Sequence, residues 1–214
     1  MTPLELADSL REELDEHLKA LRKIADMIEA MDKRLPAPEF PFVAYRSQWD
    51  ADAMAVKSDC GPACVAMLLG YRGISVLIDD ICKYLGMGPS KKYTSAADLQ
   101  RAAKNSGLAL EIVSGWHLEQ FVEHAPSIML VHYGTIPDRM DEKYIGGHWI
   151  VLLGVHGNNA IYHDPDWWGP SRELGASRTV DTIRLALAMR DCMLDGNQQG
   201  LGLVIASSKS IAGH

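Results

Sequence analysis

The residue best placed for covalent chemistry is Cys60, in the run Ser58-Asp59-Cys60-Gly61-Pro62-Ala63-Cys64. The nearly continuous apolar stretch over residues 60–71 predicts a central, buried helix. Cys60 would then stand at or near a helix N-terminus, where unpaired N–H groups and the helix dipole favour a negative charge and lower the pKa of a thiol. A small buried core residue is the competing interpretation of Cys60, and it fits Cys64, Cys82 and Cys192 well.

A histidine and a carboxylate follow on what the sequence predicts to be one hairpin. His148 opens an apolar strand after two glycines, which leave room for backbone or substrate to approach. The turn Gly157-Asn158-Asn159 joins this strand to a second one that ends at Asp164. The hairpin can bring Asp164 beside His148, where the carboxylate would orient the imidazole and stabilise its cation. Taken alone, His148 could merely cap its strand, and Asp-Pro is a common turn dipeptide.

The fourth candidate is Gln48, twelve residues before Cys60 in the run Ser47-Gln48-Trp49-Asp50. Its amide could donate a hydrogen bond to a developing oxyanion, together with the backbone N–H of Cys60. Zinc binding would be another use of similar side chains, namely Cys60, Cys64, His148 and His163. Their spacing fits no known zinc motif, so we predict neither a metal nor a cofactor.

The elements that must hold these groups alternate between helical and strand-like patterns. Residues 95–105 and 117–124 predict helices, and residues 128–133, 148–155 and 160–163 predict strands. A helix near 181–193 and a strand near 201–206 complete the chain. A helix-rich half followed by an antiparallel, strand-rich half predicts an α+β fold.

Residues 1–35 differ in composition from the rest, since 15 of these 35 side chains are charged. Thr2, Pro3 and Glu5 are typical of a helix start. Apolar residues then recur at steps of three and four, except where His17 replaces one of them, at Leu10, Leu14, Leu21, Ile24, Ile28, Met31 and Leu35. The pattern predicts a long amphipathic helix that could form a coiled coil with a second copy or a partner protein; packing along its own domain is the alternative. We therefore divide the chain into this helix, 1–35, and a domain over 36–214.

Composition limits the classes of partner. The chain has 214 residues, 47% hydrophobic and 23% charged, as expected of one soluble globular domain with a sizeable core. A net charge of −7 without a basic stripe argues against nucleic acid and anionic membranes as partners. The chain lacks a transmembrane-length apolar run and a secretory signal pattern, and its four cysteines fit reduced thiols. We expect cytoplasmic residence, or delivery with a virion or secretion machine that reads no N-terminal signal.

The chain order Gln, Cys, His, Asp resembles that of the papain-like cysteine peptidases. More narrowly, three segments resemble the bacteriocin-processing peptidases that cut double-glycine leaders, and their stand-alone relatives: SQWD, SDCGPACVAMLL and GGHWIVLLG…YHDP. The resemblance covers about residues 42–206 and implies a papain-like fold. It implies Cys60 as nucleophile, His148 as general base and acid, Asp164 as the group that orients it, and Gln48 as oxyanion donor. The membrane and ATPase domains of the family's transporter-linked members have no counterpart here, and the N-terminal helix lies outside the family pattern.

Three functions follow from these features. The first is a cysteine peptidase that hydrolyses a peptide or related amide bond in a peptide or protein substrate. The second is an acyltransferase or transpeptidase that uses the same triad, as phytochelatin synthases do on a papain-like fold. The third is a non-catalytic module that assembles through the coiled-coil helix. The presence of all four candidate residues argues against the third, because a decayed enzyme should have lost at least one of them.

Overall fold

The computed structural model describes residues 17–19, 22, 40–53, 60–88, 91, 93–136, 146–192 and 199–206. The chain divides into two compact units, Met1–Glu39 and Phe40–His214. In the first unit, residues 17–19 and 22 are helical and exposed, and the rest of the helix predicted over 1–35 lies outside the described residues. Within the described part of the chain, no helix combines the length and hydropathy needed to cross a membrane.

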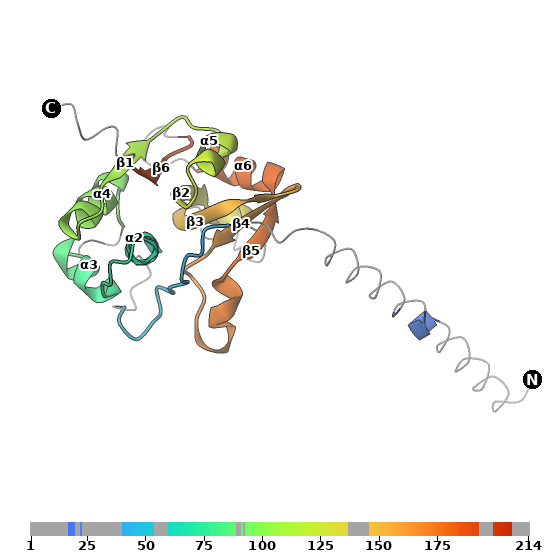
Figure 1. Ribbon diagram of the computed structural model, residues 1–214, viewed down its shortest axis with the longest axis horizontal. Coiled ribbons are helices and arrows are strands. Elements are labelled where there is room, and N and C mark those ends of the chain that lie inside the picture. Colours follow the sequence, from blue (N-terminus) through green and yellow to red (C-terminus); the bar gives the residue numbers. More distant parts are fainter. Residues whose placement is uncertain are drawn as a thin grey trace, which may run out of the picture. The chain divides into compact units, whose positions relative to one another are not determined.

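The second unit is built around a six-stranded antiparallel sheet with the order β1-β6-β2-β3-β4-β5 (Figure 1). Its strands are Leu110–Val113 (β1), Ser127–His132 (β2), Gly147–His156 (β3), Asn159–His163 (β4), Arg178–Asp181 (β5) and Gly202–Ile205 (β6). The longest strand, β3, pairs with both β2 and β4. Gly157 takes the positive φ of 57° that the tight β3–β4 turn requires. The predicted hairpin is therefore present.

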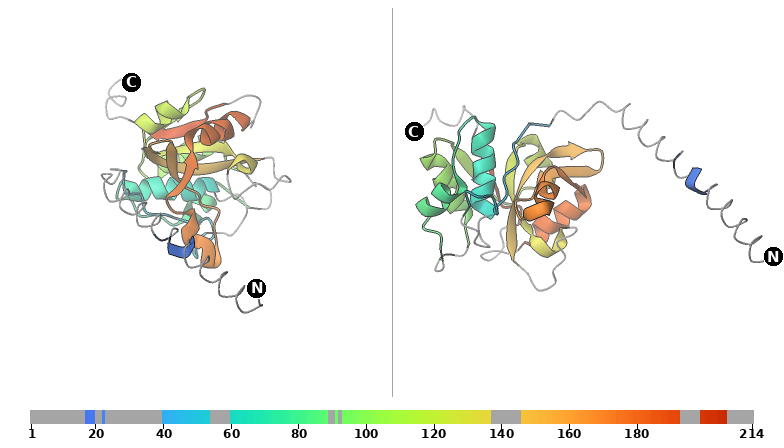
Figure 2. Two further views of the ribbon diagram at one scale, coloured as in Figure 1. Left: turned by 90° about the vertical axis from the view of Figure 1, so that its right-hand side faces the viewer. Right: turned by 90° about the horizontal axis from the view of Figure 1, so that it is seen from below.

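Helices cover both faces of this sheet (Figure 2). On one face lie Cys60–Tyr71 (α2), Ile78–Tyr84 (α3) and Ala96–Asn105 (α4); on the other lie Leu118–Glu123 (α5) and Thr182–Asp191 (α6). Residues alternate between the two faces along each central strand: Val151 of β3 packs in the core with α2, and its neighbours Ile150 and Leu152 pack in the core with α5 and α6. All of residues 60–69 are buried, as expected of a helix that is apolar on every side.

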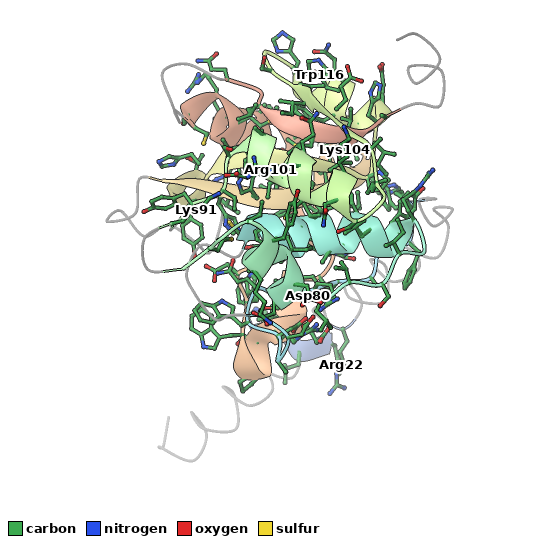
Figure 3. The ribbon with its side chains drawn as sticks, turned by 90° about the vertical axis from the view of Figure 1, so that its left-hand side faces the viewer. Arg22, Asp80, Lys91, Arg101, Lys104 and Trp116 are labelled. Atoms are coloured by element: carbon green, nitrogen blue, oxygen red, sulfur yellow. The ribbon has the colours of Figure 1, made fainter. Side chains whose placement is uncertain are left out.

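Polar contacts fix the N-terminal end of α4 on the helical side of the sheet. Ser95 caps α4, and its side chain accepts a hydrogen bond from the backbone N–H of Asp98 while the Asp98 carboxylate accepts one from the Ser95 N–H. Lys91 and Arg101, which are labelled in Figure 3, both pair with that carboxylate; the distances are 3.0 and 2.6 Å. Because Arg101 is exposed, this pair stabilises the fold only slightly.

The predicted α+β architecture is confirmed, and the predicted helices and strands of residues 60–206 are all present within a few residues of their expected bounds. Three elements were not predicted: α3, β1 and β5. Two short 3-10 helices, Tyr133–Thr135 (η1) and Gly169–Gly175 (η2), were also not predicted, and both lie close to the candidate site in sequence or space.

Candidate active site

Cys60 is the first residue of α2, and its side chain is almost entirely buried. The next residue, Gly61, packs so closely that a Cβ there would overlap Thr94 and Leu99. This contact holds the start of α2 against the segment that precedes α4. The polar residues before Cys60 in the sequence, Ser58 and Asp59, lie outside the described residues.

His148 and Asp164 form a buried pair at one end of the β3–β4 hairpin. The distance between His148 Nε2 and Asp164 Oδ1 is 2.8 Å, and the two residues are 4% and 0% exposed. Asp164 Oδ1 also accepts the backbone N–H of Asp166 at 3.0 Å, and Oδ2 accepts the indole N–H of Trp167 at 3.1 Å. Both carboxylate oxygens are therefore hydrogen-bonded, which fixes the carboxylate that faces the imidazole.

The surroundings of His148 favour its protonated form. Burial by itself lowers the pKa of the ring, but the charge and hydrogen bond of Asp164, together with a hydrogen bond to the Cys60 side chain, raise the pKa from 6.5 to about 10. Since Asp164 occupies Nε2, Nδ1 is the nitrogen left to meet the Cys60 thiol. The ring thus links a carboxylate on the sheet to a thiol on α2.

Cys64, one turn further along α2, is a different kind of thiol. It is completely buried, and burial raises its pKa well above the ordinary value, with the negative charges of Cys60 and Asp164 adding to the effect. A thiol in this environment stays protonated and unreactive. The burial and the raised pKa of Cys64 fit a thiol that packs in the core.

Gln48 reaches the same end of the sheet from the segment of residues 45–53, called the strap below. Its backbone N–H donates to the carbonyl of Pro165 at 2.9 Å, and its side-chain Nε2 donates to Asp166 Oδ1 at 3.0 Å. The side chain is buried, and its Oε1 has no hydrogen-bond partner among the described residues. The strap thus places the Gln48 amide beside the loop that carries Asp164.

Ion pairs and backbone contacts attach the strap to both halves of the domain. Arg172 of η2 donates two hydrogen bonds to Asp50, at 2.6 and 2.9 Å. On the other side, Asp52 pairs with Arg46 and accepts the N–H of Ile78 at the start of α3, at 3.2 Å. Burial would raise the pKa of Asp50, but Arg172 and the other donors hold it below its usual value, so Asp50 stays ionised.

The backbone of Asp164 and the ring of His163 are also fixed. Tyr45 donates its hydroxyl to the Asp164 carbonyl at 2.9 Å. His163 Nε2 bonds to the Val43 carbonyl at 2.8 Å, and its Nδ1 accepts the N–H of Ser177 at 2.9 Å. Burial lowers the pKa of His163, which fits a neutral, structural imidazole. With both ring nitrogens occupied, His163 has no nitrogen left for a metal.

No group of three or more His, Cys, Asp or Glu side chains that could hold a metal ion occurs within the part of the chain that the structure describes.

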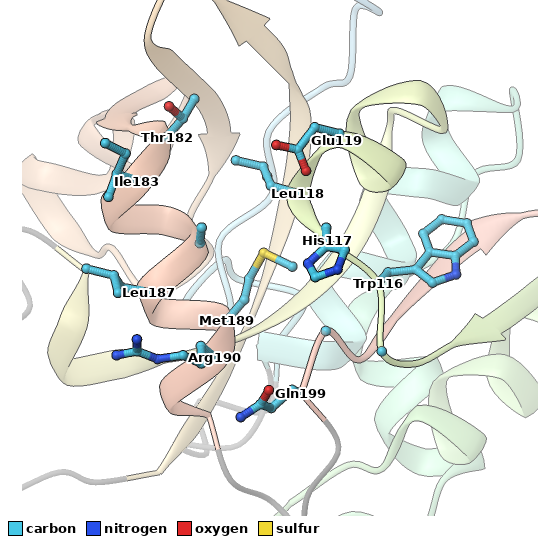
Figure 4. Close-up of a pocket in the computed structure, with 13 residues that line it drawn as sticks. Trp116, His117, Leu118, Glu119, Thr182, Ile183, Leu187, Met189, Arg190 and Gln199 are labelled. Atoms are coloured by element: carbon cyan, nitrogen blue, oxygen red, sulfur yellow. The ribbon is translucent and has the colours of Figure 1, made fainter.

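A cavity of about 500 Å³ lies away from the candidate site, between the start of α5 and the length of α6 (Figure 4). Its lining includes Trp116, Leu118, Ile183 and Leu187. None of the four candidate site residues lines it, so the cavity is separate from the site described above.

One polar residue of the site escaped the sequence analysis. Asp166 accepts hydrogen bonds from Gln48, Trp49 and Tyr133, and so lies at the centre of the polar contacts around the Gln48 amide. The signal available in the sequence was a second aspartate two residues after Asp164, which an Asp-Pro-Asp turn explains equally well.

A cysteine at a helix N-terminus, joined through an imidazole to a buried carboxylate, is the arrangement of an enzyme with a thiol nucleophile. The model of the peptidase C39 family matches residues 53–172, which is more than half of the chain. The chain belongs to this family and is a cysteine-type peptidase. No curated protein matches the chain.

Solved structures show the same fold. A double glycine motif protease from an AMS/PCAT transporter, crystallised with its leader peptide, has 19% identity and a TM-score of 0.52, and the match covers 78% of this chain and 94% of that one. The peptidase domain of Streptococcus ComA, an ABC transporter, has 19% identity and a TM-score of 0.52, covering 77% and 100%. A C39-like peptidase from Bacillus anthracis has 15% identity and a TM-score of 0.57, covering 78% and 96%.

Proposed function

We propose that this chain hydrolyses peptide bonds with Cys60 as nucleophile, His148 as general base and acid, Asp164 as the group that orients His148, and Gln48 as an oxyanion donor. The observation that carries the proposal is the 2.8 Å hydrogen bond between His148 and Asp164, in a site where the imidazole also contacts the Cys60 side chain. Because Asp164 raises the pKa of the ring, His148 can hold the proton that Cys60 gives up.

In the first half of the reaction, the Cys60 sulfur attacks the carbonyl carbon of the substrate. A C–S bond forms, and the carbonyl oxygen becomes an oxyanion that the second N–H of the Gln48 amide and the Cys60 backbone N–H are available to stabilise. The C–N bond then breaks as the His148 imidazolium gives its proton to the departing amine. The products of this half are the released amine and an acyl-enzyme on Cys60.

In the second half, water completes the hydrolysis. Neutral His148 takes a proton from the water as its oxygen attacks the thioester carbon, and the C–S bond breaks to leave a carboxylic acid and the Cys60 thiolate. Asp164 keeps Nε2 engaged throughout, so Nδ1 always faces the reacting atoms. An amine that attacked in place of water would give transpeptidation.

The substrate class that we propose is a peptide with a double-glycine cleavage site. Support comes from the structural relative that is a double glycine motif protease bound to a leader peptide. The enzyme should therefore be offered peptides with a Gly-Gly pair before the scissile bond, next to matched peptides in which the pair is Ala-Ala or Leu-Leu.

The test compares the unmodified chain with its Cys60→Ala and Cys64→Ala variants, using mass spectrometry to follow both cleavage and the acyl-enzyme. We expect Cys60→Ala to abolish both, and Cys64→Ala to retain both, because Cys64 lies in the core with a protonated thiol. Cleavage that survives Cys60→Ala would overturn the proposal. Addition of glycinamide separates the acyltransferase alternative, since only that activity would yield mainly the amide-linked product.

A further inference from the structure

The Asp166 carboxylate accepts hydrogen bonds from two separate segments of the chain, the strap and η1. Its Oδ1 accepts Gln48 Nε2 at 3.0 Å and the Trp49 indole N–H at 2.7 Å, and its Oδ2 accepts the Tyr133 hydroxyl at 2.7 Å. Its own backbone N–H donates to Asp164 Oδ1 at 3.0 Å. A single carboxylate thus connects the strap, η1 and the loop that bears Asp164.

We propose that Asp166 is a positioning residue that sets the orientation of the Gln48 amide for oxyanion stabilisation, an inference that rests on the proposed peptidase function. A carboxylate offers only acceptors, so it binds the NH2 end of the Gln48 amide and rejects the Oε1 end. One N–H is held by Asp166, and no acceptor among the described residues takes the other. That second N–H is available to the oxyanion.

The buried Gln48 Oε1 supports this reading. It has no hydrogen-bond partner among the described residues, although burying an unpaired amide oxygen is costly. If the amide turned over, Oε1 would take the place of Nε2 beside Asp166 Oδ1, and an oxygen would face the oxyanion where an N–H now does. Asp166 opposes this rotation because the turned amide would place Gln48 Oε1 against Asp166 Oδ1, and both oxygens are acceptors. The orientation of the Gln48 amide that leaves Oε1 unpaired is therefore the one that can donate an N–H to the oxyanion.

Asp166 is also linked to the ring of His148, because Tyr133 contacts both residues. The Tyr133 and His148 rings meet edge to face, with centroids 5.1 Å apart and an interplanar angle of 89°. Because the Tyr133 hydroxyl is held by Asp166, a change at Asp166 could reach the site through Tyr133 instead of Gln48. The experiment has to separate these two routes.

Two reagents that attack the same sulfur make this separation. Iodoacetamide alkylates a thiolate by direct displacement and forms no oxyanion, so its rate reports the Cys60–His148 pair alone. In acylation by p-nitrophenyl acetate, the sulfur first forms a C–S bond to give a tetrahedral oxyanion, and the C–O bond then breaks to release p-nitrophenolate. The ratio of the acylation rate to the alkylation rate at Cys60 therefore measures oxyanion stabilisation, without knowledge of the natural substrate.

We expect Asp166→Asn to lower this ratio by about tenfold or more while leaving the alkylation rate unchanged, as partial loss of an oxyanion donor should. Gln48→Ala should lower the ratio further, and adding Asp166→Asn to Gln48→Ala should lower it no more, because the two residues act as one unit. Tyr133→Phe, which keeps the ring and removes the hydroxyl, should leave the ratio near that of the unmodified chain. Asp79→Asn on α3 serves as the matched control.

Three results would overturn the inference: an unchanged ratio in Asp166→Asn, an equal fall in the presence and absence of Gln48, or a parallel fall in the alkylation rate. If Asp166→Asn unfolds, Asp166→Ala takes its place with the same expected ratio, since it removes the carboxylate without placing a donor against Gln48. Failure of the proposed function is distinguishable, because Cys60 of the unmodified chain would then alkylate no faster than Cys64 and independently of His148.

Discussion

Replacing Asp164 with asparagine removes a buried charge with little change in shape. Together, Asp164 and Cys60 raise the pKa of His148 from 6.5 to about 10 against the opposing effect of burial. At about 1.4 kcal/mol per pKa unit, this rise corresponds to roughly 5 kcal/mol in favour of the imidazolium. Loss of an adjacent opposite charge lowers a pKa by about 1–3 units, so Asp164→Asn should bring His148 well down toward its ordinary range.

The assay is the pH dependence of Cys60 alkylation by iodoacetamide, read at each cysteine by mass spectrometry. In the unmodified chain, we expect rapid alkylation from mildly acidic to alkaline pH, because the protonated ring holds the thiolate. In Asp164→Asn, alkylation at neutral pH should slow by up to about tenfold for each unit by which the pKa of His148 falls, because the ring then holds the Cys60 proton less well. The two proteins should converge at alkaline pH, where the thiolate no longer needs the ring.

The same variant should change how stability depends on pH. A group whose pKa is higher in the folded chain stabilises the fold fully below its unfolded value, and this contribution is lost as the pH rises through the folded value. Denaturant unfolding of the unmodified chain should therefore show a loss of stability on the alkaline side that Asp164→Asn lacks. An alkylation profile in Asp164→Asn identical to that of the unmodified chain would refute the reasoning, and Asp79→Asn controls for a general loss of charge.

Two further substitutions test the packing and the ion pairs around the site. Gly61→Ala should lower the free energy of unfolding by about 1–3 kcal/mol, measured by denaturant titration, because the new methyl group overlaps Thr94 and Leu99; an unchanged midpoint would show that α2 does not need this close approach. Asp50→Asn should cost about 1–3 kcal/mol at neutral pH by weakening the hydrogen bonds from Arg172. Since the pKa of Asp50 is lowered in the folded chain, the difference from the unmodified chain should shrink as the pH falls through the folded value, and a difference that grows in acid would contradict this sign.

Much of the fold could be predicted because its strongest elements carry local signals. The helix at 60–71 is apolar on every side, and the β3–β4 hairpin has a turn sequence that few other structures explain. The hairpin also brings Asp164 to His148, so half of the candidate site followed from local sequence alone. Gln48 was harder, since its place beside Pro165 depends on contacts across more than a hundred residues.

The elements that were missed are short and are specified by their neighbours. In β5, Val180 is the only buried residue of four, and the strand exists because it pairs with β4. β1 buries only its two end residues, and α3 has seven residues, too few to show a helical period. Asp166 was missed for a similar reason. Its three side-chain partners come from two distant segments, and the turn that contains it accounts for its presence locally.

The strap has a consequence for the resting molecule. Because Asp50 and Asp52 anchor it to η2 on one side and to the start of α3 on the other, the strap ties the helical half of the domain to η2. On the proposed roles, His148 would hold the Cys60 proton before any peptide binds. A thiolate formed in this way would also be open to peroxide at rest, and it would pass to sulfenic and then sulfinic acid. Readiness for catalysis and susceptibility to oxidative inactivation would then have the same structural origin.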